Sequence, residues 1–406
     1  MTIRRLAVIS MHTSPLAQPG RGDSGGMNVY VRQLSSALAR SGLECDVYTR
    51  AWSQELAPVV AVEPGLRVHH LVTGPLDEVP KEDLPALVDD FTASLKARMA
   101  TGPESDVIHA NYWLSGMVGH VLKHELDVPL VTTFHTLARV KGEGDDDPDR
   151  RAGAEMEVMG CSDAVLASSP VEAAQIRSRY GADPSRIEVV APGVDHAFFS
   201  PGHRPQARRA LGLSTAGPML LFVGRIQPLK GVDVAVRTLK ALGGFPGAFL
   251  VVVGGPSGPV GEAELARVRE LVGGLGLAGR VRFVTPQPHE LLSTYYRAAD
   301  VCLVPSRSES FGLVALEAAA CGTPVVATAV GGLRTLVDHA RTGFLVDSRD
   351  PAVFAGYAAE VLDDQRRADE MSRRAAARAR RYSWSTTAAR LRQVCAALTD
   401  RALVEC

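Results

Sequence analysis

The sequence predicts an α/β protein made of two doubly wound parallel sheets, each covered by helices on both faces. Short apolar runs alternate with helical patterns along the whole chain. These runs form two series, and a Pro- and Gly-rich stretch at residues 191–205, APGVDHAFFSPGHRP, separates them. Continuous apolar runs are typical of strands in parallel sheets, because such sheets are buried on both faces. A length of 406 residues also fits two or three domains of about 100–200 residues each.

The individual elements follow from this alternation. In the first series we expect helices at residues 29–40 and 82–99, and strands at residues 6–10, 45–49, 68–72, 107–110, 130–134, 164–168 and 187–190. In the second series we expect strands at residues 219–223, 249–253, 281–284, 301–304, 324–327 and 343–346.

A helical pattern at residues 374–398 is interrupted by YSW at residues 382–384. We therefore place a first domain at residues 1–197, a second at residues 198–381 and a separate helix at residues 382–406. Two such domains facing each other would form a central cleft at the carboxyl ends of their strands.

The composition narrows the classes of partner. With 44 basic and 45 acidic residues the formal net charge is -1, so we expect neither nucleic acid nor an anionic membrane surface as a partner. No apolar run reaches the ~18–20 residues of a membrane span. The opening MTIRRLAVIS is expected to be a buried strand rather than a signal peptide.

The cysteines are far apart, and none forms a CxxC pair. Several lie in apolar runs, so buried free thiols are expected rather than disulfides or a zinc site, in a reducing cytoplasm. The six are Cys45, Cys161, Cys302, Cys321, Cys395 and Cys406.

The most informative segment is SRSESFGLVALE at residues 306–317. A helix beginning near Ser310 would place Glu317 about two turns into it, at ~3.6 residues per turn, and Glu309 just before its first turn. One carboxylate could then bind sugar hydroxyls, the other ribose hydroxyls, and the helix start a phosphate. For two Glu alone, a capped amphipathic helix with two solvated acids is the preferred interpretation, because a two-residue pattern often occurs without a function.

Two further loops carry candidate ligands for an anion. In the segment HTSPLAQPGRGDSGGMNVYV, Gly25 and Gly26 lie just ahead of an expected helix. Backbone at such glycines can approach a ligand closely. The strand at residues 219–223 runs into GRIQPLKG, so Arg225 and Lys230 follow a strand's carboxyl end, where they could neutralise a departing diphosphate. A structural turn and two solvated cations remain the alternatives.

Polar and aromatic side chains also follow two strands of the first series. His135 follows the strand at residues 130–134 and could bind a sugar hydroxyl, or be a structural histidine. Tyr112 follows the strand at residues 107–110 and could pack in the core or donate to a phosphate. The sequence contains no HExxH and no Cys/His set at ligand spacing, so we expect no metal site, and we do not expect a serine hydrolase.

Taken together, several motifs resemble the family 4 retaining glycosyltransferases of the GT-B fold, which has two Rossmann-like domains. The resemblance extends over nearly the whole chain, and the motifs that carry it are GGMNVYV, FHTLARVK, GRIQPLKG, SRSESFGLVALEA and VGGL at residues 330–333. The resemblance implies sugar transfer from a nucleotide donor with retention of configuration. It implies that Glu309 and Glu317 contact the donor sugar and the ribose, that Arg225 and Lys230 hold the diphosphate, and that His135 lies near the donor sugar. The implied donor-binding set also includes Gly25, Gly26, Ser310, Phe311 and Gly312.

The first half is most similar to those members of the family that transfer N-acetylglucosamine from UDP to 1D-myo-inositol 3-phosphate in mycothiol biosynthesis. The segments that carry this similarity are HTSPLAQPGRGDSGGMNVYV, GPLDEVPKEDLP and HANYWLSG. The resemblance implies that the acceptor phosphate is bound by Lys81, Tyr112, Thr136 and Arg151, with Asn28 near the inositol ring. A phosphomonoester carries about −1.5 to −2 charges, which suits two cations and two hydroxyls. The segment KGEGDDDPDRRAGAEMEVMG departs from the family pattern, so Arg151 is aligned only through its spacing to Glu155.

The same resemblance implies a UDP-sugar donor, no required cofactor, a magnesium ion tolerated but not essential, a homodimer, and a terminal helix that packs back on the first domain. No carboxylate stands out as a covalent nucleophile, so we expect front-face substitution with His135, Arg225, Lys230 and Glu309 as the catalytic set. The alternatives are a related glycosyltransferase with a sugar phosphate or aminocyclitol acceptor or another donor, a non-catalytic sugar-nucleotide-binding protein, and a nucleotide-sugar epimerase.

Overall fold

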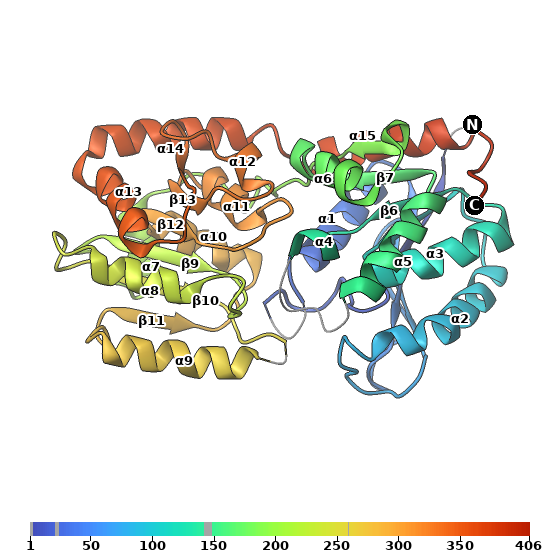
Figure 1. Ribbon diagram of the computed structural model, residues 1–406, viewed down its shortest axis with the longest axis horizontal. Coiled ribbons are helices and arrows are strands. Elements are labelled where there is room, and N and C mark those ends of the chain that lie inside the picture. The colour runs from blue at the N-terminus through green and yellow to red at the C-terminus, as the bar shows by residue number, and fades with distance from the viewer. Residues whose placement is uncertain (1–2, 21–23, 142–147, 259) are drawn as a thin grey trace. The chain divides into compact units, whose positions relative to one another are not determined.

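The chain folds into two units, each built around its own sheet (Figure 1). The computed structural model describes residues 3–20, 24–141, 148–258 and 260–406. Gly22 of the glycine-rich loop and residues 142–147 of the divergent segment before Arg151 lie outside them. Unit 1 comprises Met1–Ala17, Gly26–Gly193 and Trp384–Cys406, and unit 2 comprises Gln18–Gly25 and Val194–Ser383.

Unit 1 contains an eight-stranded sheet with the order β3-β4-β2-β1-β5-β6-β7-β8. All neighbouring strands are parallel except β3 and β4. The strands are β1 Arg5–Ile9, β2 Glu44–Arg50, β3 Val59–Glu63, β4 Leu66–Leu71, β5 Val107–Asn111, β6 Leu130–Thr133, β7 Ala164–Ala167 and β8 Ile187–Val189. The helices are α1 Gly26–Arg40, α2 Val88–Ala100, α3 Trp113–Leu126, α4 Ala138–Lys141, α5 Pro148–Cys161, α6 Pro170–Tyr180 and α15 Trp384–Leu398.

Unit 2 contains a six-stranded parallel sheet with the order β11-β10-β9-β12-β13-β14. The strands are β9 Met219–Val223, β10 Phe249–Val253, β11 Val281–Val284, β12 Val301–Val304, β13 Val325–Thr328 and β14 Gly343–Val346. The helices are α7 Arg204–Ala210, α8 Val232–Ala241, α9 Gly261–Gly274, α10 His289–Ala298, α11 Leu313–Ala320, α12 Leu333–Leu336, α13 Pro351–Asp363 and α14 Gln365–Ala379. Both sheets are therefore doubly wound, as the alternation of the sequence predicts.

Alternate residues of β9 and β10 in unit 2 are buried on opposite faces of the sheet. Leu220, Phe222, Leu250 and Val252 belong to one buried cluster together with apolar residues of α8, α9 and α13. Their neighbours Leu221 and Val251 are equally buried on the other face of the sheet. Burial on both faces explains why these strands appear in the sequence as continuous apolar runs.

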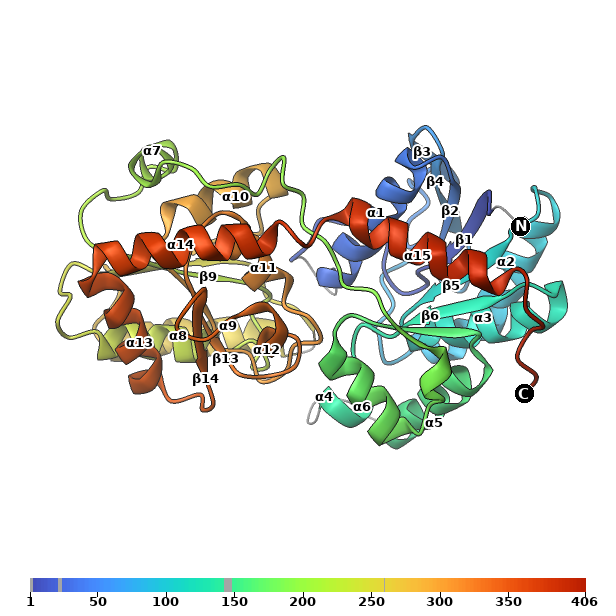
Figure 2. The same cartoon turned by 90° about the horizontal axis from the view of Figure 1, so that it is seen from above.

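The helical pattern at residues 374–398 is divided between the two units. Helix α14 ends at Ala379, and α15 begins at Trp384 after the interruption that YSW predicts. Within unit 1, α15 lies alongside α1 (Figure 2), and Thr387 Oγ1 donates a hydrogen bond to the carbonyl oxygen of Ala191 at 2.8 Å.

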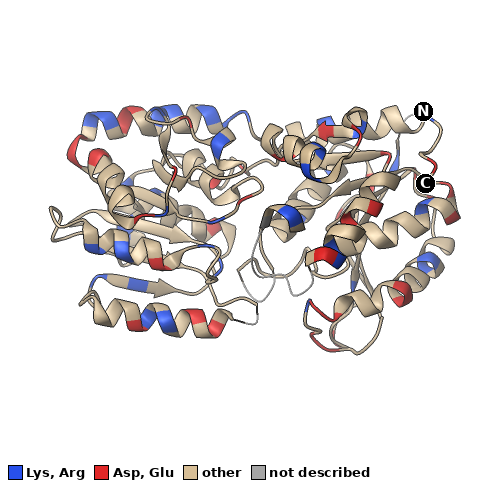
Figure 3. Cartoon of the chain, viewed as in Figure 1, with Lys and Arg blue, Asp and Glu red and all other residues tan. Residues whose placement is uncertain are grey.

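Basic and acidic residues are interspersed on the helices of both units (Figure 3). Among the described residues, no helix combines the length and the apolar character that crossing a membrane requires.

Candidate active site

The donor candidates of unit 2 lie where the strand order of its sheet reverses. From β9 the chain proceeds to β10 on one side, while β12 pairs with β9 on the other. Such a reversal opens a ligand-binding crevice beyond the carboxyl ends of the two strands. Arg225 and Lys230 follow β9, and Glu309 follows β12. The backbone N–H of Arg307 donates to the carbonyl oxygen of Leu229 at 2.8 Å, which joins the two loops.

Lys230 and Glu309 form an ion pair between these loops. The Lys230 Nζ donates to Glu309 Oε1 at 2.5 Å, and the Ser306 hydroxyl donates to the same oxygen at 2.8 Å. Both charged side chains are about one-fifth exposed or less, at 21% and 15%. These two contacts therefore orient the Glu309 carboxylate. These two residues are not the solvated surface charges of the simpler interpretation.

Glycines allow the backbone of this site to pack closely. The N–H of Gly332 donates to the carbonyl oxygen of Glu309 at 3.0 Å, and a Cβ on Gly331 would lie 1.8 Å from that oxygen. Gly331 has a φ of +46°, and Gly231 has a φ of +74°, where a Cβ would lie 2.5 Å from the carbonyl oxygen of Pro305. No other residue fits such positions without displacing the Glu309 loop.

The structure corrects the start of the helix that carries Glu317. Helix α11 begins at Leu313, after Gly312 in the left-handed region at φ 100°, rather than near Ser310. Glu317 therefore lies at the start of the second turn of α11, rather than about two turns from the beginning of the helix. Its Oε2 accepts a hydrogen bond from the buried Tyr296 hydroxyl at 2.7 Å. Burial raises the pKa of Glu317, while the charge of His289 and the Tyr296 hydrogen bond partly oppose that rise.

The remaining donor candidates divide between the two units. Arg225 and Ser310 are half-buried, and Phe311 is buried with its ring 5.7 Å from that of Tyr382. Gly25 lies in the segment that groups with unit 2, whereas Gly26 is the first residue of α1 in unit 1.

The acceptor candidates of unit 1 converge on the Tyr112 ring. Tyr112 follows β5, beside β1, where the strand order of this sheet reverses. The ammonium of Lys81 lies 4.7 Å from the ring centroid, and the guanidinium carbon of Arg151 lies 5.0 Å from it. Cations at such distances are attracted by the negative ring face. Three residues that are far apart in the sequence thus place two positive charges and one hydroxyl together.

Thr136 and Glu155 hold Arg151 in this arrangement. The Arg151 Nη2 donates to Thr136 Oγ1 at 3.0 Å and to the Thr136 carbonyl oxygen at 2.7 Å. Its Nε donates to Glu155 Oε1 at 2.8 Å, and both ionic side chains are almost fully buried. Glu155 also accepts a hydrogen bond from Tyr180 at 2.5 Å. All four predicted phosphate ligands therefore lie in one connected group, Arg151 included.

His135 lies after β6, in the same group of loops. Its Nε2 donates to Asn111 Oδ1 at 2.9 Å, and its ring lies edge-on to that of Tyr30 at 4.8 Å. Burial, assisted by the neighbouring His109, lowers the pKa of His135 to about 3. The imidazole is therefore neutral near pH 7.

Two of these residues also have unusual backbone dihedral angles. Tyr112 and His135 have φ values of 78° and 62°, in the left-handed region that is uncommon for residues other than glycine. Strain of this kind concentrates at functional sites when the surrounding structure enforces it.

Asn28 belongs to the first turn of α1. Its amide donates to Thr13 Oγ1 and to the carbonyl oxygen of Ser14, both at 2.6 Å, so it fixes the loop after β1. It is buried, with 1% of its surface exposed.

Comparison with known proteins decides the family. Residues 24–198 match Glycosyltransferase Family 4, and residues 203–381 match Glycosyl transferases group 1. The D-inositol 3-phosphate glycosyltransferase of Acidothermus cellulolyticus is 49% identical over 95% of this chain and 88% of its own length. That of Mycolicibacterium smegmatis is 48% identical over 95% and 89%. The chain belongs to the D-inositol 3-phosphate glycosyltransferases.

Solved structures agree with the fold of this glycosyltransferase. Sucrose-phosphate synthase from Thermosynechococcus elongatus has a TM-score of 0.91 at 34% identity and covers 98% of this chain and 99% of its own. Anabaena HepE in complex with UDP and glucose has a TM-score of 0.79 at 19% identity, covering 97% and 100%. The fold is GT-B, as the sequence predicts.

Several residues that contact the candidate site residues were not predicted from the sequence. The His12 ring lies 4.5 Å from that of Tyr112, and Ser306 and Tyr296 orient the two glutamates. His12 comes shortly after the first strand, and this position could have indicated that it lies near the candidate site.

The expectation that all the cysteines are free thiols needs correction. Cys45, Cys302, Cys321 and Cys395 are free and buried as expected, but Cys161 and Cys406 form a disulfide. His120, His124, Cys161 and Cys406 also form a Cys/His group, although the sequence shows no such set at ligand spacing. The partners lie on separate segments, so their sequence positions do not reveal the group.

Proposed function

We propose that this chain transfers N-acetylglucosamine from UDP-N-acetylglucosamine to 1D-myo-inositol 3-phosphate, with retention of configuration, in mycothiol biosynthesis. Family membership supports the class of acceptor. The convergence of Lys81, Arg151 and Thr136 around Tyr112 is the observation that carries the proposal.

This group suits a phosphomonoester on chemical grounds. The dianion needs several charge-assisted hydrogen bonds, which Lys81 and Arg151 supply, while Tyr112 and Thr136 add hydroxyl donors. Because Arg151 is fixed by Glu155 and Thr136, little side-chain entropy is lost when the phosphate binds. Asn28, which fixes the neighbouring loop, is proposed to lie near the inositol ring.

On the donor side, we propose that Arg225 and Lys230 bind the diphosphate, that Glu309 binds sugar hydroxyls and that Glu317 binds the ribose. The ion pair between Lys230 and Glu309 supports the first two roles, because it presents a cation and a carboxylate oxygen side by side. Gly25, Gly26, Ser310, Phe311 and Gly312 would bring backbone and a hydroxyl close to the donor.

The proposed reaction is a front-face substitution. The bond between the anomeric carbon and the diphosphate oxygen breaks, and the acceptor oxygen bonds to the same face of an oxocarbenium-like sugar. The acceptor proton passes to the departing phosphate. Arg225 and Lys230 stabilise the charge that develops on UDP, and one well-placed group of this kind contributes about 3–4 kcal/mol.

The neutral state of His135 limits its role. Because its pKa is about 3, it does not supply positive charge at the reacting carbon near pH 7. We propose that it positions the donor sugar through a hydrogen bond, with Asn111 fixing the ring orientation.

The proposal includes no essential metal, because Arg225 and Lys230 carry the charge stabilisation; added EDTA should leave the rate unchanged. It also includes a homodimer in the cytoplasm, which sedimentation and cell fractionation would test.

The deciding experiment measures UDP release from UDP-N-acetylglucosamine by the purified protein. Reactions contain 1D-myo-inositol 3-phosphate, neutral myo-inositol, a hexose phosphate or no acceptor. Release with the inositol phosphate alone would support the proposal, and anomeric proton couplings of the product would report retention. Release with the hexose phosphate alone would overturn the acceptor, and release without any acceptor would overturn transfer.

A further inference from the structure

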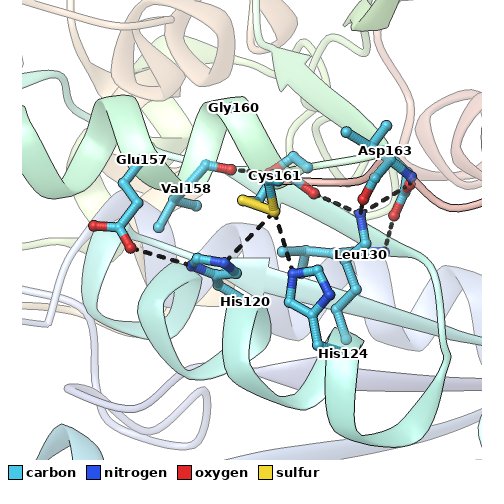
Figure 4. Close-up of a disulfide and its surroundings, with 12 residues drawn as sticks. His120, His124, Leu130, Glu157, Val158, Gly160, Cys161 and Asp163 are labelled. Atoms are coloured by element: carbon cyan, nitrogen blue, oxygen red, sulfur yellow. Dashed lines mark hydrogen bonds and ion pairs between the residues drawn. A yellow bond between two sulfur atoms is a disulfide. The ribbon is translucent and has the colours of Figure 1, made fainter.

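A group of four side chains in unit 1 lies outside the proposed substrate sites. His120 and His124 are four positions apart on one face of α3, Cys161 is the last residue of α5, and Cys406 belongs to the segment after α15 (Figure 4). Their ligand atoms all lie within 4.8 Å of one another. In this structure the two sulfurs form a disulfide.

An independent network holds the segments of this group together. The fully buried Lys123 ammonium donates to the carbonyl oxygens of Cys161 at 2.7 Å and Val404 at 2.9 Å. It also pairs with Asp163 at 3.1 Å, and the Val404 N–H donates to the same carboxylate at 2.8 Å. Cys406 is thus brought to Cys161 and α3 by contacts other than the disulfide itself.

The two distances from Cys406 to the histidines are those expected of a tetrahedral metal site. Cys406 Sγ lies 3.2 Å from His124 Nε2 and 3.7 Å from His120 Nε2. Zinc bonds of about 2.3 Å to sulfur and about 2.0–2.1 Å to nitrogen at tetrahedral angles put S and N roughly 3.5 Å apart. On the far side of the His120 ring, Nδ1 faces Glu157 Oε1 at 3.7 Å, the usual place for a carboxylate that orients a metal-binding histidine.

We propose that the reduced chain binds one Zn²⁺ through His120, His124, Cys161 and Cys406. Two cysteines and two histidines complete a closed, structural zinc site. The metal would fasten the segment around Cys406 to α3 and α5, as the disulfide does when the protein is oxidised.

Conversion of the disulfide form to the zinc-bound form balances in atoms and electrons. A dithiol reductant supplies two electrons and two protons, so the bond between Cys161 and Cys406 becomes two thiols while the reductant becomes a disulfide. Each thiol then loses its proton as its sulfur binds Zn²⁺, and metal uptake releases two protons per chain.

The test measures zinc bound per chain in the full-length protein. Protein reduced with a phosphine under inert gas is mixed with Zn²⁺, desalted and analysed by mass spectrometry for metal, beside an oxidised sample. We expect one zinc per chain after reduction and at least tenfold less in the oxidised sample. Co²⁺ in place of Zn²⁺ should give thiolate-to-cobalt charge-transfer absorption in the reduced protein only.

Variants of the chain test whether the zinc binds at the four proposed side chains. Cys406→Ser and His124→Asn alter exposed side chains and should each weaken zinc binding at least tenfold, whereas His203→Asn, an exposed histidine of unit 2, should bind as the unaltered protein does. His124→Asn gives the same comparison if Cys406→Ser does not fold. Failure of the reduced protein to retain zinc, or equal retention by His124→Asn, would overturn the proposal.

Discussion

The ammonium of Lys230 lies 2.5 Å from Oε1 of Glu309, and this pair joins the loops that follow β9 and β12. The two strands are neighbours at the point where the order of the second sheet reverses. A cation held there by a carboxylate is fixed before a donor arrives, so it needs no reorganisation to stabilise a departing diphosphate.

Replacing Lys230 by Ala should therefore affect turnover more than donor binding. We expect kcat to fall about 10²–10³-fold, the cost of one preorganised charge-stabilising group. Lys240→Ala is the matched control, because that ammonium lies on the exposed side of α8, where it donates to the carbonyl of Leu275. Steady-state kinetics decide; a rise in KM for UDP-N-acetylglucosamine with kcat unchanged would assign Lys230 to binding alone.

Replacing Lys81 by Ala should weaken binding of the phosphorylated acceptor. Hydrogen bonds to charged groups contribute about 1.5–3 kcal/mol, so KM for 1D-myo-inositol 3-phosphate should rise roughly 10–100-fold while KM for the donor hardly changes. Lys96→Ala serves as control, since Lys96 forms an exposed ion pair with Glu125. An unchanged KM for the acceptor in Lys81→Ala would remove Lys81 from the phosphate site.

The strands were largely predictable because most are buried on both faces. The expected strand at residues 219–223 coincides with β9, whose sequence MLLFV is continuously apolar. Strand β3 was not among the predicted strands. It pairs antiparallel with β4 at the sheet edge and has no fully buried residue. Its sequence, VVAVE, nevertheless contains a run of four apolar residues, so this strand carried the same kind of signal as the buried ones.

Individual residues of the candidate site could be predicted from the sequence, but the way in which they pair in space could not. Position after a strand indicated Lys230 and Tyr112, because carboxyl ends of parallel strands share an edge. The pairing of Lys230 with Glu309, and of Arg151 with Tyr112, depends on strand order and loop packing. Neither is encoded in local sequence, and the same holds for the approach of Cys406 to Cys161.

Replacing Gly331 by Ala should disturb the Glu309 loop. Its Cβ would lie 1.8 Å from the carbonyl oxygen of Glu309 at a left-handed φ of +46°, so the loop must move and activity should fall at least tenfold. Gly356→Ala is the control: it lies within α13 with no atom near the new Cβ, and should raise stability by about 0.5–1 kcal/mol. Full activity of Gly331→Ala would show that the loop tolerates the displacement.

Buried histidines should make unit 1 less stable in mild acid. Burial lowers the pKa of His109 to about 4, against about 6.5 in an unfolded chain. Between these values the unfolded state binds the extra proton, so stability rises with pH and is lost as pH falls. His109 alone should cost about 2 kcal/mol between pH 7 and pH 5.

Tryptophan fluorescence can follow this effect in unit 1, because Trp52, Trp113 and Trp384 all belong to it. The urea midpoint should drop between pH 7 and pH 5, and His109→Gln should make that drop smaller, since the variant has no imidazole to protonate on unfolding. His203→Gln, at an exposed position of unit 2, should leave the drop unchanged. The same pH dependence in His109→Gln as in the unaltered protein would mean that other groups, and not this buried histidine, set the acid sensitivity of unit 1.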